Sequence, residues 1–181
     1  MTALEPLVKI VVAGFGSVHR LDDGVGPLVA ARAERESGAR DVGPLSDPLD
    51  LLGHWNGADL VIVIDAVRSG IAPGTIGVVE IDLKRRDQDF ETVNAGGGTT
   101  STHGVGLEGV LRLAQAIGQA PKRLVVVGIE GERFGVGEGL SPAVEAAVPA
   151  AVRVVVDLTR AVSRCPRVEG RKCGPVTVTR P

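Results

Sequence analysis

The sequence predicts a single α/β domain built as a three-layer sandwich, with a mostly parallel five-stranded sheet covered by helices on both faces. Short apolar runs rich in valine and isoleucine alternate with longer segments whose apolar residues recur every three to four positions. The 181 residues are enough for one domain with a substantial core. Because 44% of the residues are hydrophobic and only 2% are aromatic, that core must be aliphatic.

Five segments are expected to form strands. Four of them are short, rich in valine and isoleucine, and bounded by Gly, Asp or Pro, which is typical of strands buried on both faces. A weaker candidate lies between the first two. In chain order the expected strands are 7–14, 40–45, 59–65, 75–83 and 123–130.

Helical spacing predicts helices over 23–37, 49–55, 104–117 and 141–162. In the last, Ser141 is expected as the N-cap with Pro142 at the first helical position, and Pro149 is expected to kink or split the helix. Alternating strands and helices indicate a mostly parallel sheet, in which ligands bind beyond the carboxyl ends of the strands.

Composition and charge exclude several classes of protein. A chain this apolar is not intrinsically disordered, and a net charge of −2 with so few aromatic rings does not fit a nucleic-acid-binding protein. No apolar run approaches the roughly 18 residues of a membrane span, and no signal peptide is visible. With only two cysteines, a cytoplasmic protein is expected.

The expected domain covers residues 1–163 and is followed by a tail, 164–181, in which the periodicity stops. The tail carries five basic residues and one glutamate, so the body is acidic and the tail is basic. A flexible, solvated tail is the simplest interpretation. Cys165 and Cys173 lie in it without a nearby histidine, which does not favour a metal site there.

The first strand is followed by a glycine-rich turn, Gly14–Gly26, that contains two adjacent aspartates. A dinucleotide site is not expected, because His19 stands where the fingerprint needs its third glycine and the aspartates would repel a phosphate. One aspartate is expected to cap the following helix. We assign that role to Asp22, which leaves Asp23 for other chemistry.

Two further polar residues follow this pattern. Asp65 ends the buried run VIVI, and His103 follows a run of three glycines at 96–98. Each has a purely structural alternative, since Asp65 could accept loop amides and His103 could be an ordinary loop histidine. Together with Asp23, however, they provide two carboxylates and an imidazole, a ligand set suited to a divalent metal that keeps open positions.

Four motifs in order give the chain a specific resemblance: GFGSxxxxDDGVG at 14–26, VIVIDAV at 61–67, STHGVGL at 101–107 and GLSPAV at 139–144. They resemble those of the hydrogenase maturation endopeptidases of the nickel–iron hydrogenases. The resemblance implies a twisted five-stranded sheet between helices and metal binding by Asp23, Asp65 and His103. It also implies an endopeptidase that removes the C-terminal extension of a hydrogenase large-subunit precursor after nickel insertion, with the substrate's nickel as the recognition element.

The chain departs from the family pattern at two places. Ser17 stands where the family usually has an asparagine, and Gly43–Pro48 replaces a glycine-rich segment after the second strand. Ser17 can still make one hydrogen bond in each direction, so we expect the loop to persist. Two prolines stiffen the second segment, which bears on substrate identity more than on the fold or the ligands.

The sequence does not indicate a serine or cysteine protease, because both cysteines lie in the tail and Ser101 is only two residues from His103. Metal-assisted hydrolysis is the working hypothesis. His19 and Arg20 could line the cleft but fit a solvated loop better, and His54 fits the edge of a packed helix. Two alternatives stay open: a module of the same fold that binds a metallated or peptide partner without cutting it, and a related peptidase with a non-hydrogenase substrate.

Overall fold

The structure is a computed structural model that describes residues 8–83 and 102–164, with side chains in the second range from residue 106. Its sheet has the strand order β2-β1-β3-β5-β4, in which only β4 runs antiparallel to its neighbour. The strands are β1 (Ile10–Phe15), β2 (Arg40–Leu45), β3 (Leu60–Val67), β4 (Ile76–Ile81) and β5 (Leu124–Glu130).

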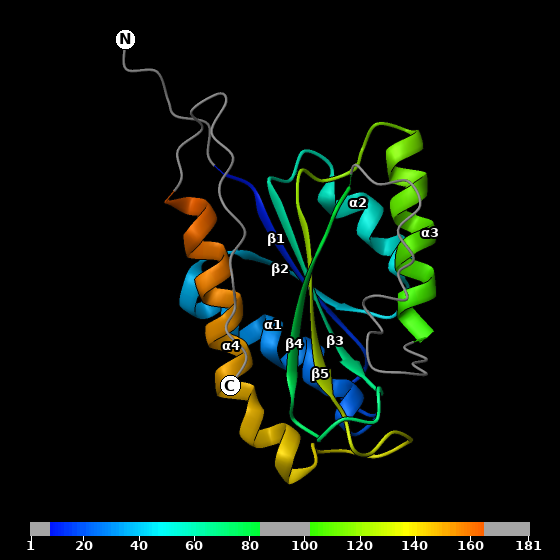
Figure 1. Ribbon diagram of the computed structural model, residues 1–181, viewed down its shortest axis with the longest axis vertical. Coiled ribbons are helices and arrows are strands. Elements are labelled where there is room, and N and C mark those ends of the chain that lie inside the picture. Colours follow the sequence, from blue (N-terminus) through cyan, green and yellow to red (C-terminus); the bar gives the residue numbers. More distant parts are fainter. Residues whose placement is uncertain (1–7, 84–101, 165–181) are drawn as a thin grey trace.

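Helices cover both faces of the sheet (Figure 1). Helices α1 and α4 lie on one face, and α2, α3 and a short 3-10 turn, η2, lie on the other. The helical elements are η1 (Asp22–Gly24), α1 (Val25–Ser37), η2 (Pro48–Leu51), α2 (Leu52–Trp55), α3 (Thr102–Ala116) and α4 (Pro142–Ser163).

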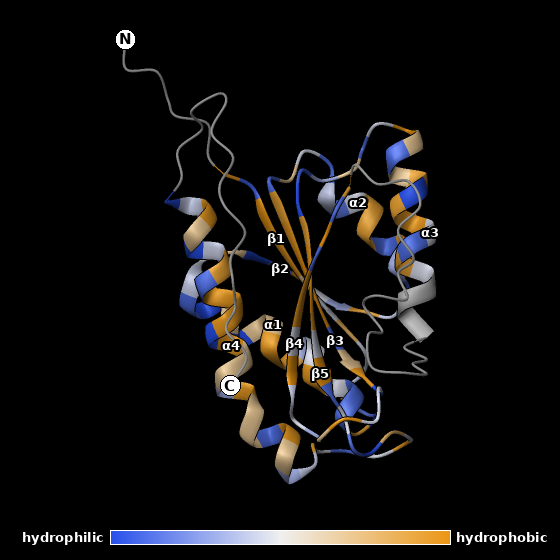
Figure 2. Cartoon of the chain, viewed as in Figure 1, coloured by the Kyte–Doolittle hydropathy of each residue, from blue (hydrophilic) through white to orange (hydrophobic). Residues whose placement is uncertain are grey.

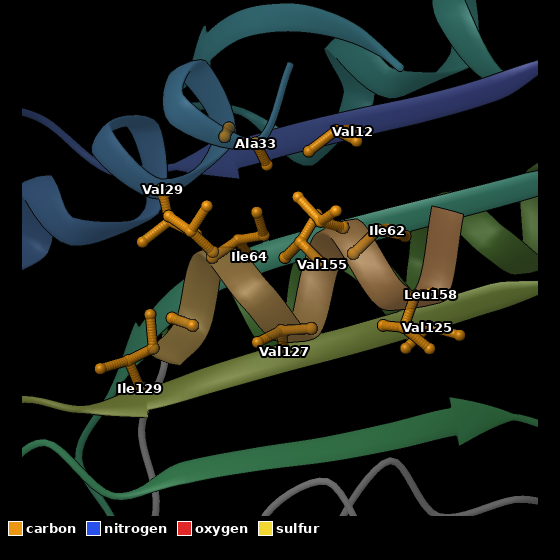
Figure 3. Close-up of a cluster of buried hydrophobic side chains, with 14 of the residues drawn as sticks. Val12, Val29, Ala33, Ile62, Ile64, Val125, Val127, Ile129, Val155 and Leu158 are labelled. Carbon is orange, nitrogen blue, oxygen red and sulfur yellow. The ribbon is translucent and has the colours of Figure 1, made fainter. Parts of the chain in front are cut away.

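Strand alternation divides the core between the two faces. On the α1/α4 face, Ile62 and Ile64 of β3 pack with Val29 of α1 and Val155 of α4 (Figure 3). On the opposite face, their neighbours Val61 and Val63 belong to a second buried cluster that contains side chains of α2, α3 and η2. Figure 2 shows the consequence: the inner strands are apolar along most of their length, whereas the helices carry polar residues on their outer sides.

The predicted three-layer α/β fold is confirmed, including its five-stranded, mostly parallel sheet and the weak strand at 40–45. The helix predicted at 104–117 begins two residues earlier, at Thr102. Residues 84–101 and 165–181 lie outside the described part, so the predicted tail 164–181 and its two cysteines stay predictions. Within the described ranges, no helix combines the length and the apolar character that a membrane crossing requires.

Two expectations about α4 are met only in part. Pro149 was expected to kink or split the helix; the split does not occur, because α4 runs from Pro142 to Ser163 as one element, and the kink stays a prediction. Pro149 is on the exposed side, so the carbonyl that loses its amide partner can be solvated, while Val148 and Val152 hold the other side in the core. Ser141 occupies the N-cap position as predicted, but its side chain makes no capping hydrogen bond.

Close backbone contacts fix where α1 begins. Gly26, in the first turn of α1, lies so close to the sheet that a Cβ there would come within 2.7 Å of the Ile64 carbonyl oxygen and closer still to that of Phe15. Gly14 in β1 faces the same contact from the strand side. The glycines of the first motif therefore bring η1 and the start of α1 against the ends of β1 and β3.

A second close contact fixes the start of α3. A Cβ on Gly106 would lie 2.8 Å from Cγ of Pro48, the first residue of η2. Because η2 follows the carboxyl end of β2, the first turn of α3 is held next to that end of the sheet. Pro48 belongs to the segment in which this chain departs from the family pattern.

Replacing Gly26 by alanine should destabilise the protein by about 1–3 kcal/mol, because the backbone must move to accommodate the methyl group. The matched control is Gly109→Ala in α3, where a Cβ meets nothing within 4 Å and where better helix propensity should stabilise by about 0.5–1 kcal/mol. Urea unfolding monitored by circular dichroism measures both changes. Equal effects of the two substitutions would contradict the close contact.

Gly106→Ala should likewise destabilise the protein by about 1–2 kcal/mol, through overlap with Pro48. Adding Pro48→Ala removes the two proline atoms nearest to the new methyl group and leaves Cβ at an ordinary 3.5 Å. In a double-mutant cycle, Gly106→Ala should therefore cost less in the Pro48→Ala background than in the wild type. Additive costs would show that Pro48 does not set the position of α3.

Candidate functional site

Four strands of the sheet end at the same edge. Strands β2, β1, β3 and β5 are parallel, so their carboxyl ends and the segments that follow them lie along this edge, which β3 and β5 reach at the lower end of the molecule in Figure 1. The first turn of α3 lies at the same end. This is the edge where the sequence places the chemistry.

Asp23 lies in η1, directly after the loop that follows β1. Its Oδ2 accepts a hydrogen bond of 3.0 Å from the Ser17 amide, and the Arg20 guanidinium lies 3.8 Å from the same oxygen. The side chain is 17% exposed, and among the described residues nothing donates a hydrogen bond to Oδ1. Asp23 is thus a held carboxylate with one oxygen available to a ligand.

Asp65 is buried near the carboxyl end of β3. Because Val61 and Val63 face the α2/α3 core, strand alternation places the Asp65 side chain on that same face. Its partner across β5 is Gly128, where a Cβ would lie 3.1 Å from the side chain of Val67.

The segments that carry Asp23 and Asp65 contact each other through their backbones. Residue Gly26, three positions after Asp23, touches the carbonyl of Ile64, the residue before Asp65, and η1 contacts β3. The structure therefore brings the segments that carry the two predicted carboxylate ligands together at one edge.

His103 is the second residue of α3, and its side chain lies outside the described part. It precedes Gly106 by one helical turn, so the Pro48 contact that fixes Gly106 also fixes the backbone of this turn. Helix α3 covers the sheet face on which Asp65 lies. Among the described side chains, which do not include His103, no group of three or more His, Cys, Asp or Glu residues could hold a metal ion.

Asp22 does not cap α1, contrary to the sequence prediction. It is completely buried, and its carboxylate accepts backbone hydrogen bonds from Glu132 (2.8 Å), Arg133 (2.7 Å) and Ser141 (2.6 Å). Burial by itself would raise the pKa of Asp22, but these amide donors outweigh it and hold the pKa below its ordinary value. Asp22 thus ties the loop that carries Asp23 to the segment between β5 and α4.

Glu130, which the sequence reasoning did not single out, holds a second loop at the same edge. Its buried carboxylate accepts hydrogen bonds from the amides of Ser69 and Gly70 (both 2.8 Å) and from the Ser69 hydroxyl (2.6 Å). These residues follow β3, close after Asp65. The signal was present in the sequence, because Glu130 ends a buried apolar run just as Asp65 does.

The other residues considered in the sequence have structural or surface roles. His19 and Arg20 are exposed, and His54 is half-buried beside the buried Trp55, as predicted. Ser17 keeps the loop intact: its hydroxyl accepts a 3.3 Å hydrogen bond from the His19 amide while its own amide binds Asp23.

Known proteins resemble this chain in both sequence and structure. The family described as hydrogenase maturation protease matches residues 43–158, more than half of the chain. The hydrogenase expression/formation protein HoxM of Azotobacter vinelandii is 31% identical over 82% of this chain and 71% of its own length. The hydrogenase 2 maturation protease of Escherichia coli K12 is 29% identical over 84% of this chain and 92% of its own.

Two solved structures share the fold. The hydrogenase maturating endopeptidase HybD from E. coli superposes with a TM-score of 0.71 and 27% identity, covering 86% of this chain and 94% of its own. The [NiFe] hydrogenase maturation protease HybD from Thermococcus kodakarensis superposes with a TM-score of 0.68 and 25% identity, covering 84% of this chain and 99% of its own. With the family match, these likenesses show that the chain belongs to the hydrogenase maturation proteases and is an endopeptidase.

Proposed function

We propose that this endopeptidase removes the C-terminal extension of a nickel–iron hydrogenase large-subunit precursor after nickel insertion, and that Asp23, Asp65 and His103 bind the nickel carried by the precursor. The observation that carries the proposal is the meeting of three segments at one sheet edge. The segment with Asp23 contacts the end of β3 with Asp65, and α3, whose second residue is His103, covers the face on which Asp65 lies.

The residues fit a divalent ion of this kind. Two carboxylates and an imidazole suit nickel, and three protein ligands leave coordination positions open for the substrate. A bound nickel ion can polarise a carbonyl group or a water molecule. The protein holds these ligands in place. The Ser17 amide orients Asp23, and the pairing of β3 with β5 fixes the backbone of Asp65. The contact between Gly106 and Pro48 fixes the helical turn that contains His103.

Buried negative charge strengthens the argument for a cationic ligand. Besides Asp23 and Asp65, the buried carboxylates of Asp22 and Glu130 lie in the segments of this edge, where each is bound by backbone amides. Carboxylates held in a partly dry environment attract a cation more strongly than they would in water. A nickel ion presented by another protein would therefore be favoured here.

Nickel titration of the purified chain by isothermal calorimetry tests the ligand set. His103→Ala should weaken nickel binding by more than about 100-fold, beyond the usual effect of altering a residue that only supports a ligand. The matched control, His54→Ala, removes a half-buried histidine on α2 and should leave nickel affinity unchanged. Circular dichroism should show both variants folded, and equal affinity in the two variants would contradict the assignment of His103.

Cleavage is tested with a nickel-loaded large-subunit precursor from the same host, with the metal-free precursor as control. Mass spectrometry should show a C-terminally shortened product only from the nickel-loaded form, and His103→Ala should abolish it. If the host's nickel-loaded precursors all stay intact, the proposed substrate is wrong and the endopeptidase acts on another protein, which would agree with the altered segment Gly43–Pro48.

A further inference from the structure

The segment between β5 and α4, residues 131–140, forms an arm that is fastened along the loop carrying Asp23. Besides the three hydrogen bonds to Asp22, the Leu21 amide donates to the Gly137 carbonyl (3.1 Å), and the Gly137 amide donates to the His19 carbonyl (2.9 Å). In this pairing Leu21 adopts a positive φ of 54°, a strained backbone conformation that is uncommon for residues other than glycine.

The base of the arm is packed against the body of the protein. The ring of Phe134 lies against Gly131, and the Arg68 guanidinium sits over the ring, 4.6 Å from its centre. Phe134 also packs against the α1/α4 core. These contacts and the hydrogen bonds hold the arm in one conformation.

The apex of the arm, by contrast, is exposed. Val136 is 98% exposed, between Gly135 and Gly137, whose φ angles of 149° and 154° favour glycine. The buried carboxylate of Asp22, the positive φ of Leu21 and the contacts of Phe134 thus hold an arm whose apex presents an exposed valine. An ordered arm with an exposed apolar tip is suited to binding a partner. Because the arm is already ordered in the free protein, little conformational entropy is lost when the partner binds.

The segments that follow the other parallel strands also expose aliphatic side chains. Val18, Leu49 and Ile71 are about half exposed, and they lie in the segments after β1, β2 and β3. With Val136 after β5, each of the four parallel strands is followed by a segment in which the described residues include an exposed large aliphatic side chain. A single exposed aliphatic residue is ordinary, but four in the segments after the parallel strands, where the sheet edge also carries Asp23 and Asp65, describe a surface suited to a protein partner.

The geometry points to the arm as a docking element for the hydrogenase large-subunit precursor, with Val136 entering an apolar recess on the folded precursor. This inference rests on the proposed function. The precursor is the favoured occupant, rather than a second copy of this chain, because the arm shares its hydrogen bonds with the loop of Asp23. A partner that covers Val136 therefore also reaches the edge where its nickel would bind.

Kinetics of precursor cleavage test the docking role with Val136→Ser. The matched control is Ile117→Ser, which removes a 51%-exposed aliphatic side chain just after α3, at the opposite end of the molecule. Val136→Ser should raise KM about tenfold, the size expected from losing one buried aliphatic side chain, with kcat, nickel affinity and Tm unchanged. Ile117→Ser should change none of these, and equal KM values for the two variants would overturn the inference.

Photocrosslinking separates this inference from the proposed cleavage. Benzoylphenylalanine is placed at position 136, or at position 117 as control, and irradiated with purified nickel-loaded precursor. A covalent adduct with the precursor from position 136 alone supports docking even if no cleavage occurs, in which case only the proposed activity fails. An adduct between two copies of this chain, or no adduct from position 136, overturns the inference.

Discussion

The carboxylate of Asp22 organises the functional edge of this protein. It is fully buried and accepts three backbone hydrogen bonds from residues that lie more than a hundred positions further along the chain. Hydrogen bonds to a charged group contribute about 1.5–3 kcal/mol each, enough to offset much of the cost of burying the charge. This one group joins the loop of Asp23, the arm and the start of α4.

Close packing supplies the second constraint on the site. Gly26 allows the first turn of α1 to approach β1 and β3, and Gly106 allows the first turn of α3 to lie against Pro48. The glycines of the motifs are therefore needed mainly for contact between elements, and the side chains proposed as ligands gain their positions from those contacts.

Local patterns in the sequence were sufficient for the fold, whereas the assignment of Asp23 and Asp65 as ligands stays a prediction. The apolar runs of β1, β3 and β5 reveal strands because burial on both faces is encoded in consecutive residues. The role of Asp22 could not be found in this way. Its neighbours suggest a helix cap, whereas its partners, residues 132–141, become neighbours only after the sheet has formed. Glu130 was different: its place at the end of a buried apolar run marks it as a buried carboxylate, and only its partner Ser69, 61 residues away, could not be found from local sequence.

The continuity of α4 through Pro149 has a similar origin. Proline disfavours the interior of an isolated helix, but here the buried residues on either side, Val148 and Val152, hold the helix against the sheet. Tertiary packing outweighs the local preference. The same balance explains why Ser141 needs no side-chain cap: the amide of Ser141 is bound by Asp22 instead.

The central claim is that Asp23, Asp65 and His103 form a nickel site made of oxygen and nitrogen ligands. X-ray absorption at the nickel edge, recorded on the full chain with one equivalent of Ni²⁺, tests it most directly. The account predicts a first shell of oxygen and nitrogen only, with an imidazole signature that disappears in His103→Ala. A sulfur ligand, which would implicate Cys165 or Cys173, or an imidazole signature that persists in His103→Ala, would contradict it.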